Sequence, residues 1–314
     1  MKLFNITFLK KIIRFLAVGV TILTATAYAE NKSVSAQKIT DHYVKLSDNV
    51  KLFYHDSGKG PVIVFVPGWT MSSEVFKAQM TYFNKKYRVI TLDPRSQGRS
   101  NVTLENNDYT QHGADLAHFL NALGLKKVTL VAWSWGCNDA YAYVRLKGVS
   151  NLRAFVCVDA SPKSSGGKDE WAGADYSDWG TAVVQPMMYN RSQFTPAWAQ
   201  SMVEHKLTPA EQKWIVKESF HTPTYAALQL LLDAIYADYR PEARLLNSCG
   251  IPTLDFVSQH SAVNATKWLH ANAPNAQIKI MGKHLMFWEH PDEFNQTLNE
   301  FLDSVASSSK NNRC

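Results

Sequence analysis

Short apolar runs alternate with longer segments of helical periodicity along most of the chain. The run Val62–Val66 is entirely apolar and mostly β-branched, which is typical of a strand buried on both faces. By contrast, Leu116, Leu120 and Leu123 recur at helical spacing, and Gly124 ends that predicted helix. Strands are predicted at 39–46, 50–55, 62–66, 87–92, 128–132, 153–158, 252–257 and 277–281, and helices at 73–84, 109–123, 136–147, 262–271 and 294–305. An opening hairpin followed by repeated strand–helix units predicts an α/β fold, with a mostly parallel central sheet and helices on both faces.

The segment 161–248 interrupts this alternation. It contains no predicted strand, but two helical stretches begin in it, at Pro209 and at Ala226. It also carries four tryptophans, which are Trp171, Trp179, Trp198 and Trp214. We therefore predict a helical cap insertion at 161–248, a core formed by 30–160 and 249–306, and a polar tail at 307–314.

The amino-terminal segment 1–29 has the pattern of a secretory signal peptide. It carries four basic residues and no acidic one, followed by the apolar run 15–25 and then Ala27-Tyr28-Ala29, which has small residues where a signal peptidase reads. The apolar run is too short for a comfortable membrane span, which needs roughly 20 residues. We expect cleavage after Ala29, export to the periplasm or the medium, and no stable membrane anchor afterwards. An uncleaved anchor helix is the alternative.

Removal of this leader changes how the charge is interpreted. The chain of 314 residues has a formal net charge of +6, but without 1–29 there remain 29 basic and 27 acidic side chains. A nearly neutral protein offers no argument for a nucleic-acid partner or an acidic membrane surface. With 46% hydrophobic and 19% charged residues, the composition is that of a globular protein rather than a disordered one or a coiled coil.

Four cysteines, Cys137, Cys157, Cys249 and Cys314, allow three full disulfide pairings, among which the sequence does not choose. Cys157 lies in a predicted buried strand, where we expect a free thiol. No Cys-x-x-Cys or His-x-x-x-His spacing occurs, so neither a structural zinc site nor a metalloprotease helix is suggested. We expect no metal and no cofactor.

The strongest chemical signal is the run Val128-Thr-Leu-Val-Ala-Trp-Ser134-Trp-Gly136. A predicted buried strand passes through small-x-Ser-x-Gly into a predicted helix, a turn that raises the serine hydroxyl above the sheet edge at a helix amino terminus. The run resembles the nucleophile elbow of the α/β-hydrolase family, specifically the serine esterase and lipase-like branch with a helical cap, although Ala132 replaces the first glycine. The resemblance implies that Ser134 is the nucleophile.

Two further segments resemble the same family. Pro67-Gly68-Trp69 follows an early central strand and resembles the His-Gly-x loop, whose backbone helps to form the oxyanion hole. By that match, the backbone amides of Trp69 and Trp135 are the oxyanion donors. Gly282-Lys283-His284 follows the last predicted strand and resembles the histidine loop, which implies that His284 is the general base. His290 is the alternative base.

The acid that would support the base is the least determined member of the triad. The position after strand 252–257, where the family usually carries it, holds Ser258-Gln-His-Ser261 and no carboxylate. The family's other position follows the preceding strand, and Asp159 matches it, so Asp159 is our predicted acid. Asp255 is the second candidate, and a carboxylate-free dyad with a polar helper among 258–261 is the third.

These residues predict a serine hydrolase that cleaves a small-to-medium hydrophobic carboxylic ester through an acyl-enzyme. Trp133, Trp171 and Trp179 are the predicted pocket residues, although the cap tryptophans could equally form the cap's own core. Lactones, thioesters and amides remain open as substrates. A cofactor-free perhydrolase or haloperoxidase and a non-catalytic small-molecule-binding homologue are the alternative functions.

Overall fold

The computed structural model describes residues 37–167 and 170–307. The predicted signal peptide and nearly all of the predicted polar tail lie outside these residues. Within the described ranges, the longest helices are too polar or too short to traverse a bilayer.

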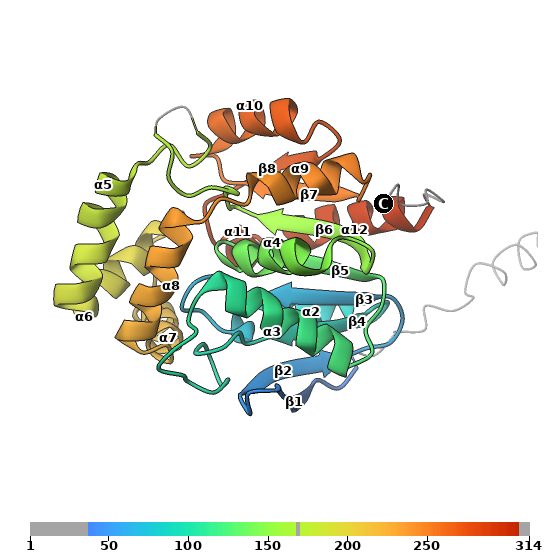
Figure 1. Ribbon diagram of the computed structural model, residues 1–314, viewed down its shortest axis with the longest axis horizontal. Coiled ribbons are helices and arrows are strands. Elements are labelled where there is room, and N and C mark those ends of the chain that lie inside the picture. Colours follow the sequence, from blue (N-terminus) through green and yellow to red (C-terminus); the bar gives the residue numbers. More distant parts are fainter. Residues whose placement is uncertain (1–36, 168–169, 308–314) are drawn as a thin grey trace, which may run out of the picture. The chain divides into compact units, whose positions relative to one another are not determined.

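Eight strands form one sheet at the centre of the molecule (Figure 1). The strands are β1 (Thr40–Lys45), β2 (Lys51–Ser57), β3 (Val62–Val66), β4 (Arg88–Leu92), β5 (Val128–Trp133), β6 (Leu152–Val158), β7 (Thr253–Val257) and β8 (Gln277–Ile280). Their order across the sheet is β1-β2-β4-β3-β5-β6-β7-β8. The β1–β2 hairpin is antiparallel, β2 also pairs antiparallel with β4, and all later pairings are parallel. The predicted α/β class with a mostly parallel sheet is confirmed.

Helices cover both faces of this sheet, as the all-apolar strands require. One face carries α3 (Tyr109–Ala122), α4 (Gly136–Lys147), α9 (Arg240–Ser248) and α10 (Ala262–Asn272). The other carries η1 (Ser73–Phe76), α2 (Lys77–Phe83), α11 (Met286–Glu289) and α12 (Pro291–Ser307). Every residue of β5 is buried, so β5 is the centre of the core from which the nucleophile turn emerges.

The cap lies at the end of the sheet to which the parallel strands point (Figure 1). It consists of α5 (Tyr176–Trp179), a π-helical turn η2 (Gly180–Val184), α6 (Gln185–Ser201), α7 (Pro209–Phe220) and α8 (Thr224–Tyr236). A reciprocal capping box between Thr208 and Glu211, with proline at the first helical position, explains why α7 begins at Pro209.

One helix of the predicted insertion does not belong with the cap. Helix α9 packs against α4 of the core, where Arg145 Nε donates to Glu242 Oε1 at 2.8 Å. Tyr141 of α4 also stacks on Tyr239, immediately before α9, with ring centroids 6.0 Å apart. The cap helices are therefore α5 to α8, and the chain has returned to the core before 249, the boundary expected from the sequence. The insertion was delimited by the stretch without predicted strands, and this criterion cannot show where the chain rejoins the core. Helix α9 covers the sheet without adding a strand, so it falls inside that stretch.

Candidate active site

Ser134 occupies a sharp turn between β5 and α4, both of which the sequence predicts. Its backbone has φ +53°, in the left-handed region that a residue with a side chain rarely adopts. The turn is held by its neighbours, since the Ser134 N–H donates to the Val158 carbonyl at 2.8 Å. The side chain therefore stands at the carboxyl end of the sheet, where the parallel strands leave a crevice.

Two glycines allow other backbone segments to approach this turn. A Cβ atom on Gly136 would lie 2.4 Å from the Pro67 carbonyl oxygen, and one on Gly68 would lie 2.8 Å from the Ser134 Cβ. The loop Pro67-Gly68-Trp69 is thus packed directly against the nucleophile turn. Ala132, at the position of the family's first glycine, is fully buried in β5 and is accommodated.

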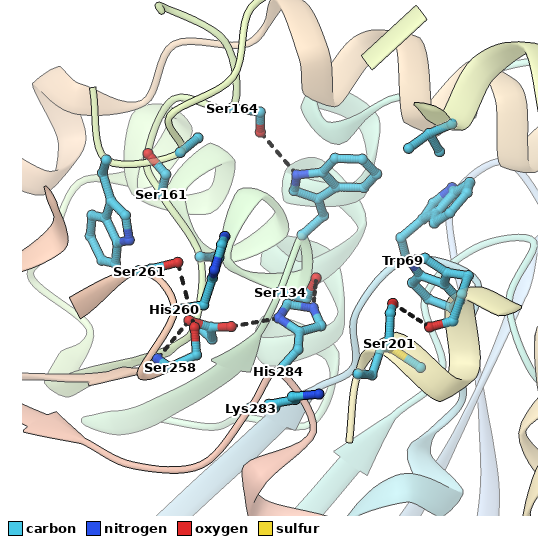
Figure 2. Close-up of a pocket in the computed structure, with 18 of the residues that line it drawn as sticks. Trp69, Ser134, Ser161, Ser164, Ser201, Ser258, His260, Ser261, Lys283 and His284 are labelled. Atoms are coloured by element: carbon cyan, nitrogen blue, oxygen red, sulfur yellow. Dashed lines mark hydrogen bonds and ion pairs between the residues drawn. The ribbon is translucent and has the colours of Figure 1, made fainter. Parts of the chain in front are cut away.

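His284 lies in the loop between β8 and α11 and faces Ser134 (Figure 2). Its Nε2 is 2.9 Å from Ser134 Oγ, and its Nδ1 is 2.7 Å from Asp159 Oδ2. This arrangement suits the tautomer in which Nδ1–H donates to the carboxylate and Nε2 accepts from the serine hydroxyl. The three side chains form one continuous hydrogen-bonded chain from carboxylate to hydroxyl.

Asp159 begins the loop after β6 and is largely buried, with 8% of its side chain exposed. Its Oδ1 accepts the Ser258 backbone N–H at 2.8 Å, and its own N–H donates to the Phe256 carbonyl at 2.8 Å. Burial by itself raises the pKa of Asp159, but the hydrogen bonds from His284 and Ser258 outweigh it and leave the pKa below its usual value. The carboxylate is therefore ionised at neutral pH and can stabilise an imidazolium.

The structure separates the three arrangements that the sequence left open for the acid. Asp159 contacts His284, whereas Asp255 is buried within β7 beside Cys157 of β6. Ser258 occupies the usual acid position and gives its amide to Asp159 rather than its hydroxyl to His284. Burial raises the pKa of Asp255 to about 7.

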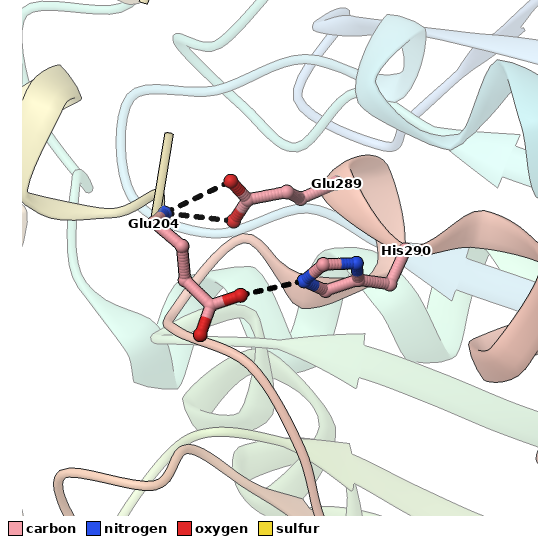
Figure 3. Close-up of side chains that lie close together, drawn as sticks. All are labelled: Glu204, Glu289 and His290. Carbon is pink, nitrogen blue, oxygen red and sulfur yellow. Dashed lines mark hydrogen bonds and ion pairs between the residues drawn. The ribbon is translucent and has the colours of Figure 1, made fainter. Parts of the chain in front are cut away.

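His290, the alternative base, lies away from Ser134. Its Nε2 is 2.7 Å from Glu204 Oε2, and Glu289 accepts the backbone N–H of Glu204 at 2.9 Å (Figure 3). Glu289 also accepts the backbone N–H of His205 at 2.9 Å. The potential ligand atoms of Glu204, Glu289 and His290 lie within 4.8 Å of one another. These polar groups already have protein partners, which join the segment after α6 to the end of α11 and the residue that follows it, so the cluster is explained as a structural tie.

A cavity of about 610 Å³ opens above Ser134 (Figure 2). Trp69 and Trp135 line it from the core, and Trp171, Trp179 and Trp198 line it from the insertion. Its polar lining includes Ser161, Ser164, Ser201, Ser258, Ser261, His260 and Lys283. The cavity thus brings the predicted Trp171 and Trp179 together with the catalytic candidates.

The tryptophans form a continuous series of ring contacts. The Trp198, Trp69, Trp135 and Trp179 rings follow one another with centroids 5.3–5.5 Å apart. The indole N–H groups of Trp69, Trp135 and Trp179 donate to Ala227 O, Ser164 Oγ and Ser164 O respectively. With those donors engaged, these rings offer the cavity mainly apolar surface.

Trp133, predicted to line the pocket, does not do so. It is 1% exposed and lies in the core on the opposite side of β5 from α4, among Phe287 and its neighbours. The alternation of side chains along a strand explains the difference, because a residue next to the nucleophile can point into the core. Trp198 was not predicted, since nothing in the sequence distinguishes it from Trp214, which stacks on Trp288.

Trp135 directly follows Ser134 in the chain, and Trp69 belongs to the loop that packs against the nucleophile turn. Within 37–167 and 170–307, the backbone N–H of neither residue donates to a protein acceptor. Both residues line the cavity. Two unengaged amides beside a nucleophile are the arrangement that can bind a developing oxyanion.

Comparison with known proteins agrees with this architecture. The profile of the alpha/beta hydrolase fold family matches residues 61–291. The chain is 28% identical to the non-heme chloroperoxidase CPO-A1 of Kitasatospora aureofaciens over 82% of this chain and 97% of that protein. It is 31% identical to the bifunctional esterase/perhydrolase DCH of Acinetobacter calcoaceticus over 48% of this chain and 56% of that one.

Solved structures show the same fold. A bromoperoxidase from Bacillus anthracis superposes with a TM-score of 0.78 at 23% identity, covering 84% of this chain and all of that one. An esterase from Exiguobacterium antarcticum superposes with a TM-score of 0.75 at 21% identity and the same coverage. Because the family profile spans most of the chain and these structures share its architecture, the chain belongs to the α/β-hydrolase fold family.

Proposed function

We propose that this protein is a serine hydrolase that cleaves small-to-medium hydrophobic carboxylic esters. The hydrogen-bonded chain from Asp159 through His284 to Ser134, at the floor of an accessible cavity, is the observation that carries the proposal. It provides a nucleophile, a base within reach of the nucleophile's proton, and a carboxylate that orients the base.

In the proposed reaction, Ser134 Oγ attacks the ester carbonyl carbon while His284 Nε2 takes the hydroxyl proton. The tetrahedral intermediate then collapses, and His284 gives that proton to the departing alcohol. Water, deprotonated by His284, attacks the acyl-serine and releases the carboxylic acid and the free enzyme. Asp159 stays ionised throughout and stabilises the imidazolium that forms at each step.

The backbone amides of Trp69 and Trp135 are proposed to bind the oxyanion. Their positions are fixed by the close packing of Gly68 against Ser134 and of Gly136 against Pro67, so the donors need little rearrangement when charge develops. Because these donors are main-chain groups, side-chain substitution will not remove them. A bulkier residue at Gly68 would displace the loop and is expected to abolish activity.

The lining of the cavity supports a hydrophobic substrate of limited size. Five tryptophans surround a volume of about 610 Å³, which is within the range of small-molecule sites. The polar side, near Ser161, Ser258 and Lys283, leaves room for the more polar part of the substrate. The leader-like sequence at 1–29 supports export, and hydrolysis in the periplasm or the medium is part of the proposal.

Kinetics on p-nitrophenyl esters of increasing chain length, with a parallel panel of lactones and amides, test the reaction. Short and medium esters are expected to be turned over, and both Ser134→Ala and His284→Ala are expected to lose about 10⁴-fold or more in kcat. Covalent labelling by a fluorophosphonate should occur in the native protein and disappear in Ser134→Ala. A folded protein that is neither labelled nor active would favour the non-catalytic binding homologue instead.

A perhydrolase activity is the second candidate, because similar proteins are named non-heme chloroperoxidase and esterase/perhydrolase. In this reaction hydrogen peroxide replaces water, attacks the acyl-serine and releases a peracid, which oxidises halide in solution. Halogenation of monochlorodimedone that requires both peroxide and a short carboxylic acid, and that is lost in Ser134→Ala, would support it. Ester cleavage without any peroxide-dependent halogenation would support hydrolysis as the sole activity.

A further inference from the structure

Two buried cysteines lie directly beneath the nucleophile and acid turns. Cys137 is in the first turn of α4, three residues after Ser134, and Cys157 is near the end of β6, two residues before Asp159. In the structure both are free thiols, as expected for Cys157, and both are buried, with 0% and 1% exposure. Their Sγ atoms are nevertheless only 2.6 Å apart. That separation is far shorter than ordinary sulfur–sulfur packing and about 0.5 Å longer than a disulfide bond.

The surrounding packing accounts for this approach. Ala132 of β5 is the register partner of Cys157, and its carbonyl oxygen is 3.2 Å from Cys137 Sγ. The three residues share one core cluster, on the face of the sheet covered by α4. Because Ala132 has a small side chain, it leaves the space over β5 into which Cys137 reaches toward β6.

We propose that Cys137 and Cys157 form a disulfide in the mature protein, which covalently joins the helix that follows the nucleophile to the strand that carries the acid. The bond would close a loop of about 20 residues, a length for which a cross-link limits the unfolded chain substantially. It would also hold together Ser134 and Asp159, whose backbones have φ of +53° and +50°. This inference concerns covalent structure and does not depend on which reaction Ser134 performs.

The chemistry of formation is thiol–disulfide exchange with an external disulfide donor, such as a periplasmic thiol oxidase or oxidised glutathione. One cysteine thiolate attacks the donor disulfide and expels one donor thiolate. The second cysteine then attacks the mixed disulfide and expels the other, so the protein loses two protons and two electrons and the donor becomes a dithiol. Burial, together with the neighbouring Cys137, raises the pKa of the Cys157 thiol well above its usual value. Because the thiolate is the reactive form, we expect the exchange to occur during folding, before α4 has covered β6.

Peptide mapping of the full chain provides the direct test. The protein is exported from a bacterial host, or refolded with a glutathione redox pair, then denatured and alkylated without reductant and digested with trypsin. Cys137 and Cys157 fall in separate tryptic peptides, 128–145 and 154–163. We expect a linked species that separates into these two peptides on reduction. Two alkylated, unlinked peptides in both preparations would overturn the proposal.

Melting temperatures of substituted proteins provide an independent readout. Cys249 is itself disulfide-bonded, so chemical reduction does not isolate the pair and substitution is needed. Cys137→Ala, Cys157→Ala and the double variant should each lower the melting temperature by about the same amount, roughly 5–10 °C, because either single change already removes the bond. Additive losses, with the double variant lower by the sum, would mean that the thiols are separate and would contradict the proposal.

Cys249→Ala is the matched control. It removes a different cysteine and should leave the linked 128–145/154–163 species unchanged. Ser134→Ala should also retain the linked species, so loss of hydrolysis and loss of the disulfide can be told apart. If the cysteine variants fail to fold, the peptide map of the unsubstituted chain still decides the question.

Discussion

The indole nitrogen of Trp133 donates a hydrogen bond of 2.8 Å to the backbone carbonyl of His284. The two rings are also neighbours, with centroids 5.3 Å apart. Trp133 is the last residue of β5, so the strand that presents the nucleophile also holds the loop that presents the base. A residue expected in the substrate pocket is thus a positioning residue for His284.

Replacing Trp133 by phenylalanine should reduce kcat by about 5- to 50-fold with little change in KM. The ring is largely kept, but the His284 loop loses its donor, and small displacements of a base are enough to slow proton transfer. The Phe76→Leu variant, a substitution in the same core cluster with no His284 contact, should lower the melting temperature while leaving kcat unchanged. Equal effects of both variants on kcat would argue against a positioning role.

Replacing Asp159 by asparagine should lower kcat by about 10³–10⁴-fold while the fold is retained. An amide at this position cannot stabilise the imidazolium, and it favours the wrong tautomer of His284. Steady-state kinetics together with circular dichroism measure the two quantities. Near-normal turnover would remove Asp159 from the triad without affecting the assignment of Ser134.

Asp255 should make the protein less stable as the pH rises. Its pKa of about 7 in the folded protein lies above the ordinary value of 3.8, so the folded state binds a proton that the unfolded state releases. The free energy of unfolding therefore falls between about pH 4 and pH 7, by roughly 4 kcal/mol at most, and is unaffected by this group at higher pH.

Asp255→Asn removes this titration and should raise the melting temperature at pH 8 by several degrees, with a smaller gain at pH 5. Thermal unfolding at the two pH values measures the difference. Catalytic activity should stay within a few-fold of the unsubstituted enzyme, because Asp255 does not contact His284. A variant that is destabilised at pH 8 would contradict the raised pKa of Asp255.

Truncating Trp179 to alanine should change substrate selectivity more than catalysis. The ring lines the cavity and contacts Trp135, so its removal should raise KM for short hydrophobic esters by about 10-fold and favour longer acyl chains. Trp214→Ala is the matched control, since Trp214 is also a cap tryptophan but packs against Trp288 outside the cavity. Its KM values should be unchanged across the ester series.

Local sequence patterns were sufficient to predict the elements that carry the site. The predicted helix 136–147 coincides with α4, and the turn before it holds Ser134 because a buried strand, small residues and a glycine specify that geometry within a few positions. The order of strands and helices is likewise predictable from the sequence, because the hydrophobic periodicity that distinguishes them depends only on residues close together in the chain. The resemblance of three motifs then gave the fold family and the three triad candidates.

Tertiary packing decided what depends on residues far apart in the chain. His284 is 150 residues from Ser134 in the chain. Only the parallel arrangement of the strands places the carboxyl ends of β8 and β5, and so the loops that follow them, at the same end of the sheet. The choice of Asp159 over Asp255 depended on which side chain leaves the sheet toward His284, and the choice of Trp198 over Trp133 depended on which faces of α6 and β5 meet the cavity. Sequence periodicity indicates that a side chain is buried, but only the assembled layers determine which other side chains it is buried against.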